Sequence, residues 1–459
     1  MSTFTKPLGR PCWQRLHPLS AAAALVLGMW ASNAMAQQSV PPGDESTEEE
    51  PTSTEQGQTP LDESFGLKTH QEWVRETRRK ALEDTKWDVQ VRSYYLDREK
   101  YDDTDSTAWA LGGSVGFKTG YFRERFAFGA TGYGSAPLYA PDDKDGTLLL
   151  KPGQEAYAVL GELYGEFLVT EDIRLSLGRR AIDTPYINRN DSRMTPNTFQ
   201  AATVQGLHGG DEGRPEWRWG GGYFDEIKER NSDDFVSMSR DAGATVERGV
   251  YALGGNYKMG DFSFGAVDYY SNDIINIFYT EAKYGVPLGE KTKLNFALQY
   301  SDQQATGDNL LRGDDFEARQ WGAKAELGWR GALLTAGYTA ASGDTNMQNP
   351  WSGYPGYTSV QVEDFNRDGE DAWLLRAAYN FQTVKGMSIY GLYVDGSTPE
   401  APGQFAKDEY DFNWQWTIGE GVLKGLMLRL RYAHVEQSDP ADTDLDDLRI
   451  MVYYDPPSL

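Results

Sequence analysis

The sequence predicts an all-β fold, a transmembrane antiparallel β-barrel of about 18 strands. From residue 87 onward, apolar and polar residues alternate with a period of two, as in strands that face lipid on one side and a polar lumen on the other. No later segment has the roughly 18 consecutive apolar residues that a membrane-spanning helix needs. The joining segments are alternately short and long, and polar stretches such as 347–357 are expected to be external loops.

The first 36 residues have the three parts of a secretory signal peptide. Three basic residues and no acidic ones lie in the first 15 positions, an apolar stretch follows at about 19–30, and a small-x-small cleavage site ends at Ala36. Cleavage there would also remove Cys12, the one cysteine of the sequence. We therefore expect 1–36 to be a signal peptide, and a mature chain without disulfides or thiolate metal ligands.

Two further segments precede the expected barrel. Residues 37–68 are acidic and rich in proline, serine and threonine, a composition that buries too little apolar surface to offset the entropy of ordering. We expect a disordered periplasmic tail there. Residues 69–86 combine Trp73, Val74 and Leu82 with helix-favouring arginine, lysine and glutamate, which predicts a short helix before the barrel.

The barrel is expected to occupy 87–459, and its first strand shows the alternation clearly. Trp87, Val89 and Val91 lie on one face of this strand, and Arg92 and Tyr94 lie on the other. A β-sandwich would alternate in the same way, but its apolar face would point into a core. Aromatic residues gather at the ends of the expected strands, as in the girdles at the two bilayer interfaces, so we favour the barrel.

Charge and histidine content argue against several functions. A formal net charge of −25 disfavours binding to nucleic acid, which needs clustered basic side chains. The three histidines after the expected signal peptide lie far apart and in no metal-binding spacing. We therefore expect no metal and no other cofactor.

The segment GRRAIDTPYINRNDSRMTPNTFQ, at 178–200, resembles the loop region of the OprD family of outer-membrane porins, the substrate-specific carboxylate channels. VRSYYLDR at 91–98, DAWLLRAAY at 371–379, KGLMLRLRYAH at 424–434 and LRIMVYYDPPSL at 448–459 extend the resemblance over most of the mature chain. The resemblance implies a monomeric 18-stranded barrel in the outer membrane of a Gram-negative bacterium. It also implies one external loop folded into the lumen as a constriction, and a ladder of basic side chains that guides carboxylates.

The loop that matches the family's constriction loop is 183–199. Pro185 and Pro196 bracket a polar segment suited to a fixed, non-strand conformation. Arg193 could either anchor this loop to the wall or face the passage, and we favour anchoring. The candidate constriction residues are Tyr186, Asn188, Asn190, Asp191, Ser192 and Arg193.

Several arginines alternate with apolar residues, so that they point into the predicted lumen. The first strand must pair with the last to close a barrel, which would bring Arg92, Arg429, Arg431 and Arg449 into one basic patch. Arginine suits a carboxylate path because its planar fork binds carboxylate bidentately and stays charged. The candidate pore residues are Arg92, Tyr94, Arg376, Arg429, Arg431 and Arg449.

A structural alternative stands beside this interpretation, because inward arginines could simply pair with inward carboxylates and stiffen the wall. Glu162, Glu166 and Glu326 are the candidate partners. We expect Glu162 and Glu166 to lie across the barrel from the closing strands. Opposed acidic and basic walls would then give a transverse field that orients an anion or a zwitterion.

These observations favour passive, selective uptake of small organic carboxylates, anionic or zwitterionic, without catalysis. The alternative from another class is a polysaccharide-export or adhesion barrel, which a constriction loop in the lumen would argue against. A barrel enzyme such as an outer-membrane phospholipase would need serine and histidine side by side on the lipid-facing surface. His434 is close to such a position, but no serine motif accompanies it. The expected surroundings are outer-membrane lipid.

Overall fold

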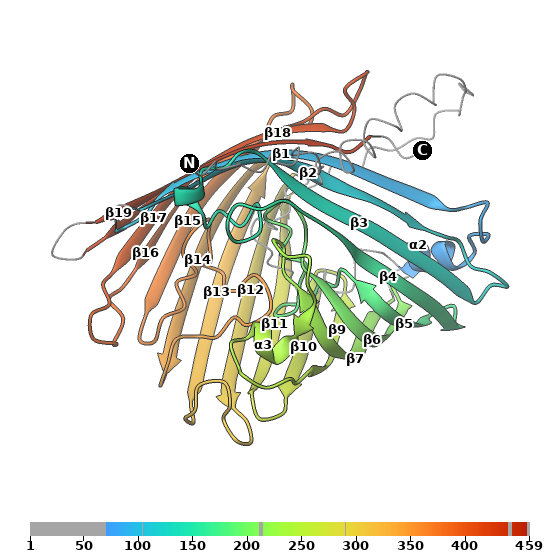
Figure 1. The fold of residues 1–459 in the computed structure, drawn as a ribbon, viewed down its shortest axis with the longest axis horizontal. Coiled ribbons are helices and arrows are strands. Elements are labelled where there is room, and N and C mark those ends of the chain that lie inside the picture. Colours follow the sequence, from blue (N-terminus) through green and yellow to red (C-terminus); the bar gives the residue numbers. More distant parts are fainter. Residues whose placement is uncertain (1–69, 103, 211–213, 290, 439–442, 457–459) are drawn as a thin grey trace, which may run out of the picture. The chain divides into compact units, whose positions relative to one another are not determined.

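The computed structural model describes residues 70–456 apart from 103, 211–213, 290 and 439–442 (Figure 1). Outside the long strands it has the helices α2 (His70–Thr77), η1 (Asp142–Lys144) and α3 (Met238–Asp241) and the two-residue strand β8 (Val236–Ser237). The long strands are β1 (Lys86–Glu99), β2 (Asp105–Lys118), β3 (Phe126–Tyr139), β4 (Tyr157–Thr170), β5 (Ile173–Arg180), β6 (Thr198–Gly209), β7 (Glu216–Lys228), β9 (Val250–Met259), β10 (Phe262–Ser271), β11 (Ile275–Gly289), β12 (Thr292–Ala305), β13 (Glu317–Trp329), β14 (Ala332–Gly343), β15 (Asp371–Asn380), β16 (Met387–Gly396), β17 (Lys407–Thr417), β18 (Leu426–Gln437) and β19 (Asp444–Tyr454).

The strands form one antiparallel sheet that closes on itself. β1 pairs with β2 along its whole length and with β19 on its other edge, where Arg92 lies opposite Tyr453. β8 pairs with the end of β7 and does not span the barrel. The prediction of a closed antiparallel barrel of about 18 strands is therefore confirmed.

The outer face of the sheet is apolar and exposed. On β5, Leu175 and Leu177 point outward and are exposed, whereas Arg174 and Ser176 between them point inward and are buried. The same alternation places exposed large side chains on strands all around the barrel, among them Trp87, Trp109, Phe126, Tyr251, Leu298, Trp321, Trp373 and Ile450. Among the described residues, no helix is both long and apolar enough to cross a membrane.

The two ends of the barrel differ in the length of their connections. Turns such as 171–172 and 330–331 lie at the end where β1 begins and β19 ends, which we call the short-turn end. The long loops lie at the opposite end. The largest are 140–156, 181–197, 229–249 and 344–370, which we name the β3–β4, β5–β6, β7–β9 and β14–β15 loops.

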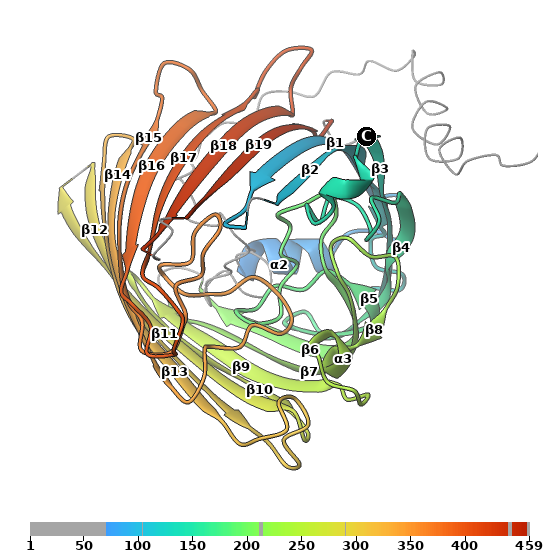
Figure 2. The same cartoon turned by 60° about the vertical axis from the view of Figure 1, so that its left-hand side comes forward.

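Two of these loops pack against each other in the lumen (Figure 2). The ring of Tyr186, from the β5–β6 loop, contacts the ring of Tyr354, from the β14–β15 loop, with a centroid distance of 6.1 Å. Trp351 is 1% exposed, and its indole donates to the carbonyl of Met238. Residues 347–357 lie in a long loop, as expected, but this loop folds into the lumen, because its aromatic side chains are buried against the inner wall and the β5–β6 loop.

The N-terminal segment is helical over a shorter range than 69–86. α2 ends at Thr77 because the following backbone makes other hydrogen bonds. The carbonyls of Arg79 and Ala81 accept from the N–H groups of Tyr121 and Gly120 in the β2–β3 turn, at 2.8 Å each. The predicted signal peptide (1–36) and acidic tail (37–68) lie outside the described residues.

Candidate functional site

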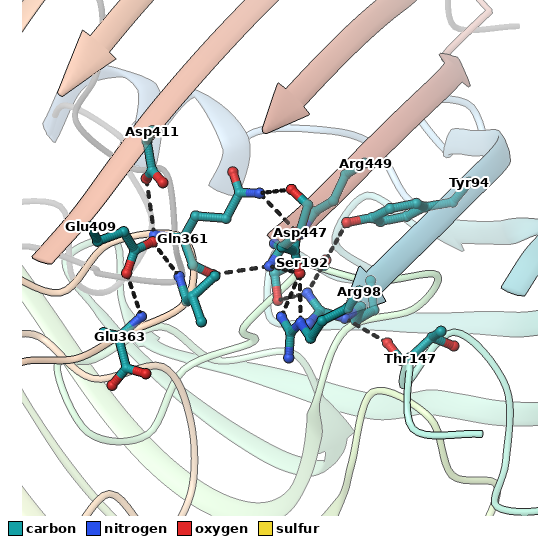
Figure 3. Close-up of polar contacts among 12 residues, drawn as sticks. Tyr94, Arg98, Thr147, Ser192, Gln361, Glu363, Glu409, Asp411, Asp447 and Arg449 are labelled. Carbon is teal, nitrogen blue, oxygen red and sulfur yellow. Dashed lines mark hydrogen bonds and ion pairs between the residues drawn. The ribbon is translucent and has the colours of Figure 1, made fainter. Parts of the chain in front are cut away.

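The β5–β6 and β14–β15 loops meet the inner wall at strands β17, β19 and β1 (Figure 3). Gln361 of the β14–β15 loop donates from Nε2 to Asp447 Oδ1 at 2.8 Å, and its carbonyl accepts from Arg449 at 2.9 Å. From the β5–β6 loop, Ser192 accepts through its carbonyl from the Tyr94 hydroxyl at 3.4 Å. The contact zone of the two loops with these strands is the constriction discussed below.

Arg92 binds the β5–β6 loop through a two-pronged ion pair. Its Nη1 and Nη2 lie 2.5 and 2.6 Å from the two carboxylate oxygens of Asp191, and Nη1 also donates to the carbonyl of Arg193 at 2.9 Å. Burial disfavours the charged carboxylate, but the charge and hydrogen bonds of Arg92 lower the pKa of Asp191 below its usual value. Arg92 thus fastens the loop to the first strand.

A second carboxylate, Asp447, organises the last strand. It is fully buried, and its oxygens lie 2.5 Å from Arg449 Nε and 2.7 Å from Arg98 Nε. Because Asp447 also accepts from Gln361, the same carboxylate holds two arginines and the β14–β15 loop. Charge-assisted hydrogen bonds of this kind are roughly twice as strong as neutral ones.

Strand β17 holds the β14–β15 loop through its backbone. The carboxylate of Glu409 accepts from the N–H groups of Val362 and Glu363 at 2.7 and 2.8 Å, and Asp411 accepts from Gln361 N at 3.1 Å. Glu409 and Asp411 are two positions apart, so both point into the lumen. These three hydrogen bonds give the tip of the loop a fixed position on the wall.

Three cations of the constriction have no carboxylate within salt-bridge distance among the described residues. Arg193 donates to the carbonyls of Thr147 and Ser192. Arg230 donates to the Ser192 hydroxyl at 2.6 Å, and Lys228 donates to the Thr195 hydroxyl and to a backbone carbonyl. All these hydrogen-bond partners are hydroxyl or carbonyl oxygens, so no carboxylate neutralises the charges of Arg193 and Arg230 in place.

Burial and like charge act together on the two loop arginines. Burial, and after it the nearby Arg449 and Arg230, lower the pKa of Arg193 well below its usual value. Burial also lowers the pKa of Arg230 to about 10, with Arg449 and Arg98 acting in the same direction. The surroundings of both groups therefore favour a nearby negative charge.

The remaining predicted wall arginines lie on the same inner face, around one tyrosine. Arg376 lies over the ring of Tyr390, 4.3 Å from its centroid, and Arg431 Nη2 donates to the Tyr390 hydroxyl at 3.4 Å. Arg431 is also directly opposite Arg449 in the strand register. Arg429 donates to Asn413 Oδ1 at 2.7 Å. β1, β18 and β19 are neighbours, as expected for the closing strands.

Most of the predicted loop residues fasten the β5–β6 loop. Tyr186 OH lies 2.7 Å from the Ser301 hydroxyl of β12, and Asn188 Nδ2 donates to the carbonyl of Gly353 at 3.2 Å. Asn190 donates through its N–H to Asn188 Oδ1 and accepts from the Ser192 hydroxyl. Arg193 anchors as favoured, but to the β3–β4 loop at Thr147 rather than to a strand of the wall.

The three predicted acidic partners of the arginines make other contacts. Glu166 pairs with Lys118 and Arg180, at 2.8 and 3.1 Å. Glu162 accepts from Tyr133 and from a backbone N–H, and Glu326 pairs with Lys324 at 3.4 Å.

The expectation that Glu162 and Glu166 face the closing strands across the barrel is wrong. They lie on β4, which only β2 and β3 separate from β1. In an antiparallel barrel of this topology neighbours in sequence are neighbours in space, so the fourth strand lies near the closure.

Sequence reasoning missed Arg98, Lys228, Arg230, Gln361 and Asp447. Asp447 precedes Arg449 by two positions, a spacing that puts both on one face of a strand, and this signal was available in the sequence. Arg230 and Gln361 lie in long loops whose path the sequence pattern does not indicate.

In the part of the chain that the structure describes, no cluster of three or more His, Cys, Asp or Glu side chains could hold a metal ion.

No curated protein matches the chain by sequence. Solved structures with the same fold include OccK9 (OpdG) of Pseudomonas aeruginosa (TM-score 0.74, 23% identity) and a BenF-like porin of Pseudomonas fluorescens Pf-5 (0.74, 21%). A third solved structure is that of OpdK of Pseudomonas aeruginosa with vanillate (TM-score 0.69, 20% identity). Each match covers 83% of this chain and 100% of the other chain. The model of the outer membrane porin, OprD family, matches residues 80–457. The chain therefore belongs to the OprD family of outer-membrane porins, channels of the Gram-negative outer membrane.

Proposed function

We propose that this porin is a passive, selective channel for small organic carboxylates, and that its constriction forms a weak anion-binding site. The observation that carries the proposal is the set of three cations, Arg193, Arg230 and Lys228, whose partners are hydroxyl and carbonyl oxygens rather than carboxylates. A solute that brings a carboxylate supplies the negative charge that this site lacks.

The charges around these cations strengthen the proposal. Arg92, Arg98 and Arg449 add three positive charges, and Asp191 and Asp447 offset two of them. The excess is therefore positive on the side of the constriction formed by β1, β19 and the β5–β6 loop. Two unit charges 4 Å apart interact by about 4 kcal/mol at the effective dielectric constant of about 20 near a protein surface. Such a site attracts an anion and still releases it, which conduction requires.

Aromatic groups beside the arginines favour carboxylates that carry a ring. Tyr390 lies between Arg376 and Arg431, and Tyr94 reaches the β5–β6 loop at Ser192. Guanidinium and phenol groups together bind the charge and the ring face of an aromatic acid. The similar channel OpdK was solved with vanillate, an aromatic carboxylate, and this supports the same solute class here.

Two loops in the lumen disfavour the alternative of polymer export, because a polysaccharide needs a wide passage. The β5–β6 and β14–β15 loops are fixed to the wall by Arg92, Asp447 and Glu409.

We also propose that the channel works as a monomer. Its exposed apolar side chains continue around the barrel, which suits a complete lipid surround.

Single-channel recording in planar lipid bilayers tests the proposal. Benzoate, acetate and succinate are added to the protein in KCl, each beside the uncharged amide of the same shape. We expect each carboxylate, and not its amide, to reduce the chloride current in a concentration-dependent way with millimolar dissociation constants, about −4 kcal/mol of binding free energy. Equal responses to benzoate and benzamide, or no response to either, would overturn the proposed function.

A further inference from the structure

α2 lies inside the ring of strands at the short-turn end (Figure 2). Its Trp73 is 4% exposed, and the indole Nε1 donates to the carbonyl of Glu171 in the β4–β5 turn at 3.0 Å. The guanidinium of Arg174, on β5, lies 3.7 Å from the centre of the Trp73 ring and donates to its carbonyl at 2.9 Å. His70 lies 2.8 Å from Asp172. The helix is thus held on the inner wall by specific contacts.

The same helix brings a carboxylate to two cations of the wall. Glu76 lies 2.9 Å from Lys118 Nζ through one oxygen and 3.1 Å from Arg174 Nη1 through the other. Arg174 is 6% exposed. Its Nε is buried and makes no hydrogen bond with the described residues.

The wall beneath Glu76 carries excess positive charge of its own. Lys118, Arg174 and Arg180 surround Glu166, which accepts from Lys118 at 2.8 Å, from Arg180 at 3.1 Å and from the Tyr121 hydroxyl. Glu162 also lies near Arg180, so two wall carboxylates face three wall cations. The third carboxylate comes from α2, a segment before the barrel.

α2 lies outside the part of the chain that matches the family. The family model begins at residue 80, after the helix ends at Thr77, whereas Lys118 and Arg174 lie within the match. The helix therefore lies before the segment that the family model describes.

We propose that Lys118 and Arg174 form a second carboxylate-binding site at the short-turn mouth, and that Glu76 of α2 occupies this site as an internal competitor. This inference rests on the proposed function, because it assumes that carboxylates reach the mouth. An arriving carboxylate presents the same pair of oxygens as Glu76 and replaces it between the two cations. Release of Glu76 loosens the attachment of α2 to the inner wall.

Helix release is measured directly with a spin label on α2. Cys12 is the one cysteine of the sequence, so Gln71→Cys with Cys12→Ser gives a single labelling site on the exposed side of the helix. We expect saturating benzoate, and not benzamide, to convert the label from a restrained to a mobile spectrum. A label that stays restrained at benzoate concentrations that reduce the current would overturn the inference and leave the proposed function standing.

Benzoate binding from the short-turn side is the second measurement, made with full-length chains. Trp73→Ala with Glu76→Gln vacates the wall site, and we expect the benzoate dissociation constant to fall about tenfold, the effect of one charge-assisted contact of about 1.4 kcal/mol. Adding Lys118→Gln should cancel the gain. Glu83→Gln, which removes the same charge at an exposed position, should leave the constant unchanged. An unchanged constant in the Trp73/Glu76 variant, or a gain that survives Lys118→Gln, would overturn the inference.

Discussion

The wall arginines Arg92 and Arg449 and the loop arginines Arg193 and Arg230 carry the same charge but have different partners. Arg92 and Arg449 each bind an aspartate, Asp191 and Asp447, at hydrogen-bond distance and are almost fully buried. Arg193 and Arg230 have hydroxyl and carbonyl partners. A paired arginine fixes a loop with its charge neutralised, whereas Arg193 fixes its loop through carbonyl oxygens and keeps a charge that, in the proposed channel, an anion can neutralise. The comparison shows that the partner, more than the inward direction, decides which role an arginine has.

The largest effect is expected when a paired arginine loses its carboxylate. Asp447→Asn removes the carboxylate that pairs with buried Arg449 and with partly buried Arg98, and breaking a buried ion pair from one side costs about 3–5 kcal/mol. We expect the free energy of unfolding, measured by urea titration in detergent, to fall by about that amount. Asp446→Asn, which removes the neighbouring charge on the outward face, should change it by less than about 1 kcal/mol. Equal losses in the two variants would contradict the structural role of Asp447.

The opposite pattern is expected for the loop cations. Arg193→Gln with Arg230→Gln removes two charges that hold no carboxylate, so the loss of stability should be smaller than in Asp447→Asn. We expect the benzoate dissociation constant, measured from the current block, to rise about tenfold or more, because each charged contact contributes about 1.5–3 kcal/mol. Arg123→Gln with Arg330→Gln, at exposed turns of the short-turn end, is the control. The account fails if this control weakens benzoate binding as much.

Protonation of Asp364 should change the net charge around Arg230, because this partly buried carboxylate lies near Arg230 without forming an ion pair with it. Burial raises its pKa from 3.8 to about 6, and Glu363 acts in the same direction while Arg230 opposes it. Its contribution to loop stability is therefore present below pH 3.8 and lost as the pH rises through 6. At pH 5 it is mostly neutral and offsets less of the Arg230 charge.

We therefore expect an anion to bind a few-fold more tightly at pH 5 than at pH 8. Benzenesulfonate is a suitable probe because it stays ionised over this range. The Asp364→Asn variant should show a smaller difference in affinity between the two pH values than the wild type. An undiminished pH dependence in this variant would assign the effect to another group.

The smallest effect is expected for Arg429 and Arg431, the lumen-facing arginines of strand β18. Arg429→Ala with Arg431→Ala removes two lumen-facing charges that contact Asn413 and Tyr390. Carboxylate uptake into liposomes should slow by a few-fold while the barrel stays folded. Leu428→Ala with Leu430→Ala changes the outward neighbours on the same strand and should leave uptake unchanged. Wild-type uptake in the arginine variant would remove these two residues from the carboxylate path.

The fold could be predicted from the sequence because lipid imposes a local rule. Each strand must place apolar residues on every second position, and Leu175 and Leu177 on β5 or Leu428 and Leu430 on β18 show this directly. Closure of the first strand onto the last follows from the barrel architecture, and it placed Arg92 beside β19 correctly.

The partners of the arginines could not be predicted in the same way, because they come from loops without periodicity. Asp191 lies 99 positions from Arg92, and Gln361 lies 88 from Arg449. No local sequence pattern indicates a contact between residues so far apart, whereas the i, i+2 spacing of Asp447 and Arg449 could be recognised in the sequence. The aromatic residues at 351–357 could also have indicated a loop that folds inward, because large aromatic side chains are more often buried than exposed to water.

The most direct test of the central claim is the reversal potential in a KCl gradient across a planar bilayer. We compare the wild type with two double variants, Arg193→Gln/Arg230→Gln and Lys324→Gln/Glu326→Gln. The second variant removes a neutralised pair on β13, so the account predicts that it keeps the anion preference of the wild type. The first variant should lose that preference. Equal reversal potentials in the two variants, or an unchanged potential in the Arg193/Arg230 variant, would contradict the account.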